Sequence, residues 1–442
     1  MTDMHVTREL LRAIASGKLP PRALTEIGWR HLLKLCPYCS EEVAAFQRER
    51  AAPASYDAAF RLLPVVLEKQ ASDFEAKTAA ARKDLRELLR ISPEERLARI
   101  HRASSRFRGV TFARLLLDEA KGRMPAEPQI VHELAEAAEA VLLRTPDSPG
   151  LYDLFARAVA YRANAKRAQG DLLAAGDTLR HARGLMRNKG VTDPLVYAEV
   201  DWIEGALLKD QRQIKEAEEL LVRAVNLYGL TGTNEEAAQP LVTLGLLYHD
   251  RGDTQKAIEV TRVAAEMMGP KADPRFYLCT RHNLTLFLAE SGDYRAAAEA
   301  LREDEKLYSK FPDLWTNLRQ IWLKGKIDLG LGALENAEPQ LVEARNGFIA
   351  QGIGYDAAMV SLDLALVYLQ QGRTEDLKKL ADEMHQIFIA GDVHREAMAA
   401  LLLFEDAVRQ EKLTVKVLED LANYLKRARQ NPGLRFRVPL PS

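Results

Sequence analysis

The chain has 442 residues, and its 62 lysines and arginines nearly balance its 63 aspartates and glutamates. This balance excludes an overall electrostatic attraction to nucleic acid or to a membrane surface, although a local patch remains open. The three cysteines are too few for a disulfide framework and indicate a reducing compartment, so we expect a cytoplasmic protein. The N-terminus lacks a signal-peptide layout, and no apolar run approaches the roughly 18 to 20 residues that span a bilayer.

Residues 1–50 predict a small module of short helices. Leu24–Leu35 reads as a helix that runs into Cys36-Pro37-Tyr38-Cys39. Two thiolates at this spacing can both reach one tetrahedral zinc ion, and an imidazole one helical turn earlier supplies a third ligand. The residues proposed as zinc ligands are His5, His31, Cys36 and Cys39.

The spacing between His31 and Cys36 decides whether this zinc site forms. Four residues separate them, so on a continuous helix the thiol would point about 100° away from the imidazole face. Zinc binding therefore requires the helix to end near Leu35, which Pro37 favours. A metal-free helical module and a redox-active thiol pair are the alternatives.

This N-terminal segment resembles the zinc-binding domain of bacterial anti-sigma factors, in which an upstream Cys or His precedes an H-x3-C-x2-C motif. Here one extra residue lies between His31 and the first cysteine. The resemblance implies zinc as a cofactor, a sigma factor as a partner and a role in bacterial transcription regulation.

Residues 51–126 predict a helical linker region. A new helix is expected at Ser92-Pro93-Glu94-Glu95, which has the pattern of a capping box. From Lys77 to Arg123 basic residues outnumber acidic ones, and a solvated helix face is the simplest interpretation. An acidic partner is one alternative, and a contact with nucleic acid is a weaker one because no set of stacking aromatic residues interleaves the arginines.

Residues 127–429 predict an array of helical hairpins, followed by a short tail at 430–442. Gly252, Gly292, Gly332 and Gly372 recur at intervals of forty residues, and each lies between two helix-like segments. Arg212 and Gly170 continue the series towards the N-terminus. A fixed period of this length indicates a repeat architecture, so we predict an all-α fold, an α-solenoid of antiparallel hairpins.

The repeats resemble tetratricopeptide repeats, which place one small residue in the first helix and two in the second. Small residues at a helix crossing let two backbones pack closely. The matching residues are Ala163, Ala175 and Ala182; Gly205, Ala217 and Ala224; Gly245, Ala257 and Ala264; and Gly325, Ala337 and Ala344.

Two repeats depart from this pattern, and the period exceeds the usual 34 residues of the family. Asp304 replaces the second small residue in one repeat, and Leu377 and Met384 replace both in another. We expect a wider or rotated helix crossing in these two repeats.

The resemblance also implies a binding groove lined by one face of the first helices, which we call the first-helix face. Trp202 and Trp322 with basic side chains suit a surface for extended or helical peptides, although packing between repeats is the alternative for both tryptophans. The residues of the first-helix face are Arg157, Asn164, Arg167, Glu199, Trp202, Lys209, His249, Asp250, His282, Arg319, Trp322 and Lys326.

No catalytic signature is present in the sequence, so we do not expect an enzyme. Cys279 and His282 have a spacing that could ligate a metal, but a buried packing cysteine is the simpler interpretation. The favoured function is a protein-binding scaffold that holds a partner protein or peptide. The alternative is a regulator, responsive to a metal or another ligand, whose solenoid senses a small molecule or peptide.

Overall fold

The structure is a computed structural model of the whole chain. It describes residues 75–103, 106–124, 127–148, 150–268, 272–390, 404–410 and 412–430, with a few isolated positions elsewhere. Every regular element in these ranges is helical, which confirms the predicted all-α fold. None of the helices within these ranges is long and apolar enough to cross a membrane.

The chain divides into two compact units, Met1–Thr243 and Leu244–Ser442. The helices in the first are 75–89, α5 (Pro93–Arg102), α6 (Gly109–Arg123), α7 (Pro128–Leu143), α8 (Leu151–Ala168), α9 (Leu172–Asn188), α10 (Pro194–Asp210) and α11 (Ile214–Thr231). Helix α12 (Asn234–Arg251) spans the division. The helices in the second are α13 (Thr254–Met267), α14 (Pro274–Glu290), α15 (Tyr294–Glu303), α16 (Glu305–Tyr308), α17 (Leu314–Gly330), α18 (Leu334–Ala350), α19 (Gly354–Gln370), α20 (Thr374–Ala390), 404–409 and α22 (Val415–Gln430).

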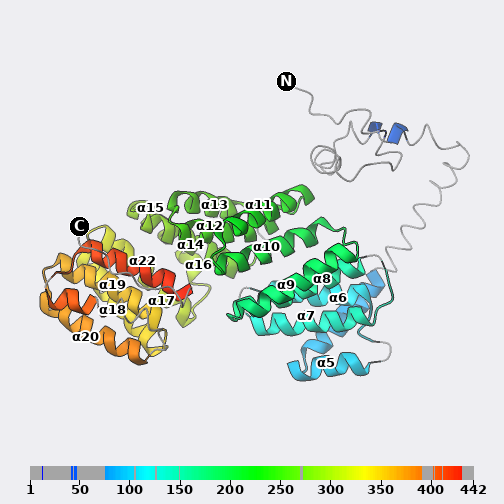
Figure 1. Cartoon of the computed structure of the whole chain (residues 1–442), viewed down its shortest axis with the longest axis horizontal. Coiled ribbons are helices and arrows are strands. Elements are labelled where there is room, and N and C mark those ends of the chain that lie inside the picture. Colours follow the sequence, from blue (N-terminus) through cyan, green and yellow to red (C-terminus); the bar gives the residue numbers. More distant parts are fainter. Residues whose placement is uncertain are drawn as a thin grey trace, which may run out of the picture. The chain divides into compact units, whose positions relative to one another are not determined.

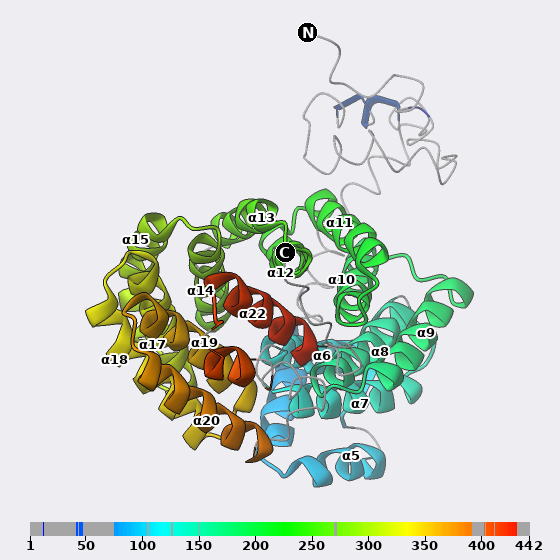
Figure 2. The ribbon, with the colours of Figure 1, turned by 60° about the vertical axis from the view of Figure 1, so that its left-hand side comes forward.

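Within each unit, consecutive helices pack as hairpins, as Figures 1 and 2 show. In the first unit, α8 packs against α9 and α10 against α11; in the second, α17 packs against α18 and α19 against α20. The first helices of successive hairpins also pack on one another, as in α8 with α10 and α17 with α19. This stacking of tetratricopeptide-like hairpins confirms the predicted solenoid class.

The turns between paired helices follow the forty-residue series. Backbone φ is positive at each of these turn residues, from 63° at Arg212 to 87° at Gly170 and Gly292. Glycine is favoured there because a Cβ atom clashes in the left-handed region, so Arg212 carries a cost that the glycines avoid. The structure therefore confirms the whole series as turns, Arg212 included.

Aspartate side chains cap the starts of two helices in the repeats. The side chain of Asp193 accepts from the Leu195 amide at the start of α10, and Asp273 accepts from the Phe276 amide at the start of α14. Helix α5 begins at Pro93 as expected, but the Ser92 side chain makes no capping hydrogen bond. The capping-box prediction was wrong at Ser92, whose carbonyl oxygen accepts from Glu95 instead.

The helix crossings are as close as the small residues predict. A Cβ atom built on Gly205 would lie 2.7 Å from Leu221 Cγ, so no larger residue fits there without rearrangement. Ala217 and Ala224, which face this crossing, are completely buried.

The repeat that carries Asp304 differs from the others. Its second helix is interrupted, because α15 ends at Glu303 and the short α16 starts at Glu305. Asp304 is 6 % exposed, and both its carboxylate oxygens accept from Arg281 Nε, at 2.8 and 3.0 Å. This repeat therefore has a broken helix around a buried ion pair, while the wider or rotated crossing expected in it stays a prediction.

Buried ion pairs also connect first and second helices elsewhere. The fully buried Asp201 on α10 accepts from Arg223 on α11 at 2.7 Å and from Arg183 on α9 at 2.6 Å. Two repeats further on, Arg281 and Glu303 occupy the positions of Asp201 and Arg223, and their side chains are 3.0 Å apart. The charges at these equivalent positions are therefore reversed between the two repeats.

One hydrophobic core runs from Ala81 to Leu207, and another from Leu318 to Leu425. The first core contains residues on both sides of residue 127, where the sequence predicts the boundary between the linker region and the hairpin array. This boundary stays a prediction. Several arginines of the basic stretch have acidic partners, including Arg106 with Asp84 and Glu87. These pairs agree with the interpretation of a solvated helix face.

Candidate functional site

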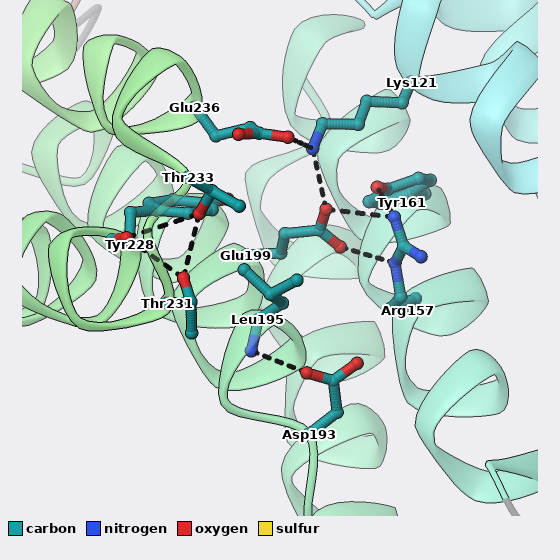
Figure 3. Close-up of polar contacts among 10 residues, drawn as sticks. All are labelled: Lys121, Arg157, Tyr161, Asp193, Leu195, Glu199, Tyr228, Thr231, Thr233 and Glu236. Carbon is teal, nitrogen blue, oxygen red and sulfur yellow. Dashed lines mark hydrogen bonds and ion pairs between the residues drawn. The ribbon is translucent and has the colours of Figure 1, made fainter. Parts of the chain in front are cut away.

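The candidate site is the first-helix face, and its clearest cluster surrounds Glu199 (Figure 3). Glu199 lies on α10 and is 2 % exposed. Its carboxylate accepts from Arg157 Nε at 2.6 Å, from Arg157 Nη2 at 3.0 Å and from Lys121 Nζ at 3.0 Å. Lys121 also lies 3.9 Å from Glu236, so the cluster joins side chains of α6, α8, α10 and α12.

The electrostatics of the cluster favour an ionised Glu199. Burial opposes its charge, but the adjacent Arg157 and Lys121 outweigh burial and lower the pKa of Glu199. Burial and the negative charge of Glu199 raise the pKa of Tyr161, whose hydroxyl accepts from Arg157 Nη2 at 3.0 Å. The buried Glu199 carboxylate and its two cationic partners connect neighbouring repeats. All three charges are needed, because removing one would leave a buried charge without compensation.

Tyr228 on α11 adds a second buried phenol to this cluster. Its side chain is fully buried, and its hydroxyl has no hydrogen-bond partner among the described residues. Burial and the charge of Glu199 raise the pKa of Tyr228. The phenol therefore stays neutral at physiological pH.

A similar arrangement lies at the C-terminal ends of α8 and α10. The Asp210 carboxylate accepts from Arg167 Nη1 at 2.6 Å and from Lys209 Nζ at 2.7 Å. Arg167 Nε also donates to Asn164 Oδ1 at 3.0 Å. Four predicted face residues, Arg157, Asn164, Arg167 and Lys209, thus belong to two polar networks on the same pair of helices.

Both predicted tryptophans are half-buried and are bonded to the next repeat. Trp202 Nε1 donates to Thr243 Oγ1 at 3.1 Å, and Trp322 Nε1 donates to Asp363 Oδ2 at 2.7 Å. Their rings pack against the two hydrophobic cores. Each tryptophan therefore contributes to packing between repeats while one part of its ring stays accessible.

In the second unit, His249 and Lys326 have acidic partners as well. His249 Nε2 lies 2.5 Å from Glu290, and its ring stacks on Phe287 with centroids 4.7 Å apart. Lys326 Nζ donates to Asp363 at 2.7 Å, and the charges of Asp363 and Glu290 raise the pKa of Lys326 despite its burial.

Helix α17 carries an exposed tryptophan next to residues of the first-helix face. Trp315 is 39 % exposed, and the Arg319 guanidinium lies 4.9 Å from the centroid of its ring. The edges of Trp315 and Trp322 both meet Phe348 on α18, each with centroids 5.9 Å apart. Trp315, Arg319, Trp322 and Lys326 thus form one stripe, because their spacing places them on one side of the helix.

Cys279 is exposed on α14, so the expectation of a buried packing cysteine was wrong. No group of three or more metal-binding side chains occurs in the part of the chain that the structure describes. His282 lies on the same helix. Its Nδ1 atom is 2.7 Å from the Tyr308 hydroxyl. Burial, together with the positive charge of Arg319, lowers the pKa of His282 to about 3. His282 is therefore neutral at physiological pH and connects α14 to α16.

Sequence reasoning missed the partners of the first-helix face. They are acidic or hydroxyl side chains about one repeat further along the chain, as in Arg157 with Glu199 and His249 with Glu290. A search for opposite charges one period apart would have found these two pairs. The residues missed were Lys121, Tyr161, Asp210, Thr243, Glu290, Trp315 and Asp363. The predicted zinc ligands His5, His31, Cys36 and Cys39 lie outside the described residues.

The fold defines the class of protein, a tetratricopeptide-like α-solenoid. No protein-family profile and no curated protein sequence matches the chain. Among solved structures, a Rap protein complexed with Competence and Sporulation Factor is similar, with a TM-score of 0.55 and 13 % identity, over 72 % of this chain and 87 % of that chain. The apo form of RapI is similar with a TM-score of 0.53 and 11 % identity, over 71 % of this chain and 86 % of that chain. At these identities the likeness concerns the fold.

Proposed function

We propose that the chain is a non-catalytic scaffold that binds a partner protein or peptide on its first-helix face. The observation that carries this proposal is the stripe on α17, where an exposed tryptophan, a stacked arginine and a half-buried tryptophan lie in a row. Tryptophan and arginine are the residues that most often dominate binding energy at protein interfaces. The similar Rap structure, solved with a bound factor, supports a binding role for this fold.

The test is a selection of peptides from a random display library on the full-length protein, followed by titration of the enriched peptides. We expect Trp315→Ala to weaken binding by about 30-fold, since a central aromatic anchor contributes about 2 kcal/mol or more. Leu314→Ala is the matched control, because Leu314 is 51 % exposed on the same helix but lies off the stripe. Equal binding by both variants, or no enriched peptide, would contradict the proposal.

The N-terminal module supports a finer proposal, which rests on its resemblance to anti-sigma factors. We propose that it holds zinc and contributes a second contact, with a sigma factor as the partner in transcription regulation. Co-purification of a sigma factor with the full-length protein, and its loss in a Cys36→Ser/Cys39→Ser variant that stays folded, is the expected result. A sigma factor that fails to bind the zinc-loaded protein would remove this proposal.

A further inference from the structure

A pocket of about 390 Å³ lies in the second unit, between α14 and the interrupted second helix of the same repeat. None of its lining residues belongs to the first-helix face. Tyr277 and Arg281 on α14 form one side, and the opposite side is formed by Glu303, Asp304, Lys306, Leu307 and Lys310.

The pocket lies where this repeat departs from the others. Ala224 and Ala344 are fully buried at the position that corresponds to Asp304, and their helices α11 and α18 run without interruption. Asp304 instead needs a charged partner, because a buried carboxylate without one is strongly destabilising. The helix breaks at Asp304, and the pocket is lined by residues on both sides of this break.

The charges around the pocket do not balance. Arg281 engages both carboxylates, with Asp304 at 2.8 Å and Glu303 at 3.0 Å. The ammonium groups of Lys306 and Lys310 have no hydrogen-bond or ion-pair partner within the described ranges. Three cations therefore face two carboxylates, which leaves one excess positive charge at the pocket mouth.

We propose that this pocket binds a carboxylate-bearing ligand, with the carboxylate at the Lys306 and Lys310 ammonium groups and the apolar part against Tyr277 and Leu307. A single carboxylate matches the one excess charge, and the volume falls in the range of small-ligand sites. Arg281 is already committed to Glu303 and Asp304, so the two lysines are the available cations. The ligand is either a free small acid or an acidic side chain of a bound peptide. Ligand binding in this pocket does not require a peptide to be bound on the first-helix face.

The test uses 3-phenylpropionate and its neutral amide as probes, with saturation-transfer NMR on the full-length protein. We expect the acid to bind with a dissociation constant on the order of 1 mM, since its ion pairs are solvent-exposed, and the amide not to bind. The Lys306→Gln/Lys310→Gln variant should bind the acid at least about tenfold more weakly, because both neutralising charges are gone. Leu307→Trp, which fills the pocket without changing its charge, should also abolish binding.

Lys215→Gln/Lys324→Gln is the matched control, because it removes two exposed lysines that likewise have no ion-pair partner in the described part of the chain. Unchanged binding in this control, with helicity retained in all variants, supports the proposal. The proposal would be overturned if the control lost as much affinity for the acid as the lysine variant, or if the pocket variants bound the acid as well as the wild type does. It would also be overturned if the wild type did not bind the acid. Acetyl-Ala-Glu-Ala-amide distinguishes the two sources of the carboxylate. If this peptide binds more tightly than 3-phenylpropionate, the site is assigned to a peptide side chain. If it binds more weakly, the site is assigned to a free small acid.

Discussion

At the scale of single residues, the turn between α10 and α11 shows how the repeat constrains the backbone. Arg212 has a φ of 63°, in the region that L-residues with a side chain rarely adopt. The Gln213 amide donates to the Leu208 carbonyl at 2.9 Å across this turn, as the corresponding residues do around Gly252 and Gly332. The turn geometry is therefore kept even where the sequence lacks glycine.

We expect Arg212→Gly to be more stable than Arg212→Ala by about 1 kcal/mol, because only glycine adopts a positive φ without a steric cost. Alanine is the proper reference, since both substitutions remove the contacts of the guanidinium group. Urea unfolding monitored by circular dichroism measures the difference. An alanine variant as stable as the glycine variant would show that this turn does not strain its central residue.

At the scale of helices, the sequence predicted the period, the turns and the start of α5, because glycine and proline act locally. It could not predict that α15 ends at Glu303, since this depends on Arg281 reaching Asp304 from another helix. The composition of the first-helix face was predicted from the repeat pattern. Its ion pairs were not, because several partners, such as Glu199 for Arg157 and Glu290 for His249, lie about one repeat away.

The contact between α14 and α16 predicts a pH dependence of stability. The pKa of His282 is about 3 in the folded chain, against 6.5 ordinarily, so below pH 6.5 the unfolded chain takes up a proton that the folded chain does not. The stabilisation by neutral His282 is complete above pH 6.5 and is lost as the pH falls towards 3. When the pH falls from 7 to 5, the free energy of unfolding should therefore decrease by up to about 2 kcal/mol less in the His282→Gln variant than in the wild type.

Urea unfolding of both proteins at pH 7 and pH 5 tests this expectation. Carboxylates such as Glu199, whose lowered pKa also destabilises the fold in acid, affect both proteins equally and cancel in the comparison. Identical losses in the two proteins would mean that His282 is accessible to protons in the folded state.

At the scale of the whole molecule, the described residues form two hydrophobic cores, whereas the N-terminal module is a prediction from the sequence. The small residues that recur at the helix crossings of the repeats are buried, so the repeat pattern explains part of both cores from the sequence. The metal chemistry expected of residues 1–50 depends instead on four side chains and on a helix that ends near Leu35.

We expect the purified full-length protein to contain about one zinc ion per chain, because Cys36 and Cys39 have the spacing of a tetrahedral site. His31→Ala and Cys36→Ser should each lower the zinc content well below this value when it is measured by atomic emission. Cys279→Ser is the control and should keep the metal, since Cys279 lies on α14 within the repeats. A wild-type protein without zinc after purification in zinc-supplemented medium would refute the assignment.

The reversed charges between equivalent helix pairs have a consequence for how the gene can change. Repeats of equal length are prone to loss by unequal recombination, and a deletion of two repeats would join α10 directly to α15. Asp201 would then exchange Arg223 for Glu303, which brings a second carboxylate next to a buried one. Such a shortened chain should fold less stably, so the reversed charges oppose the loss of this particular pair of repeats.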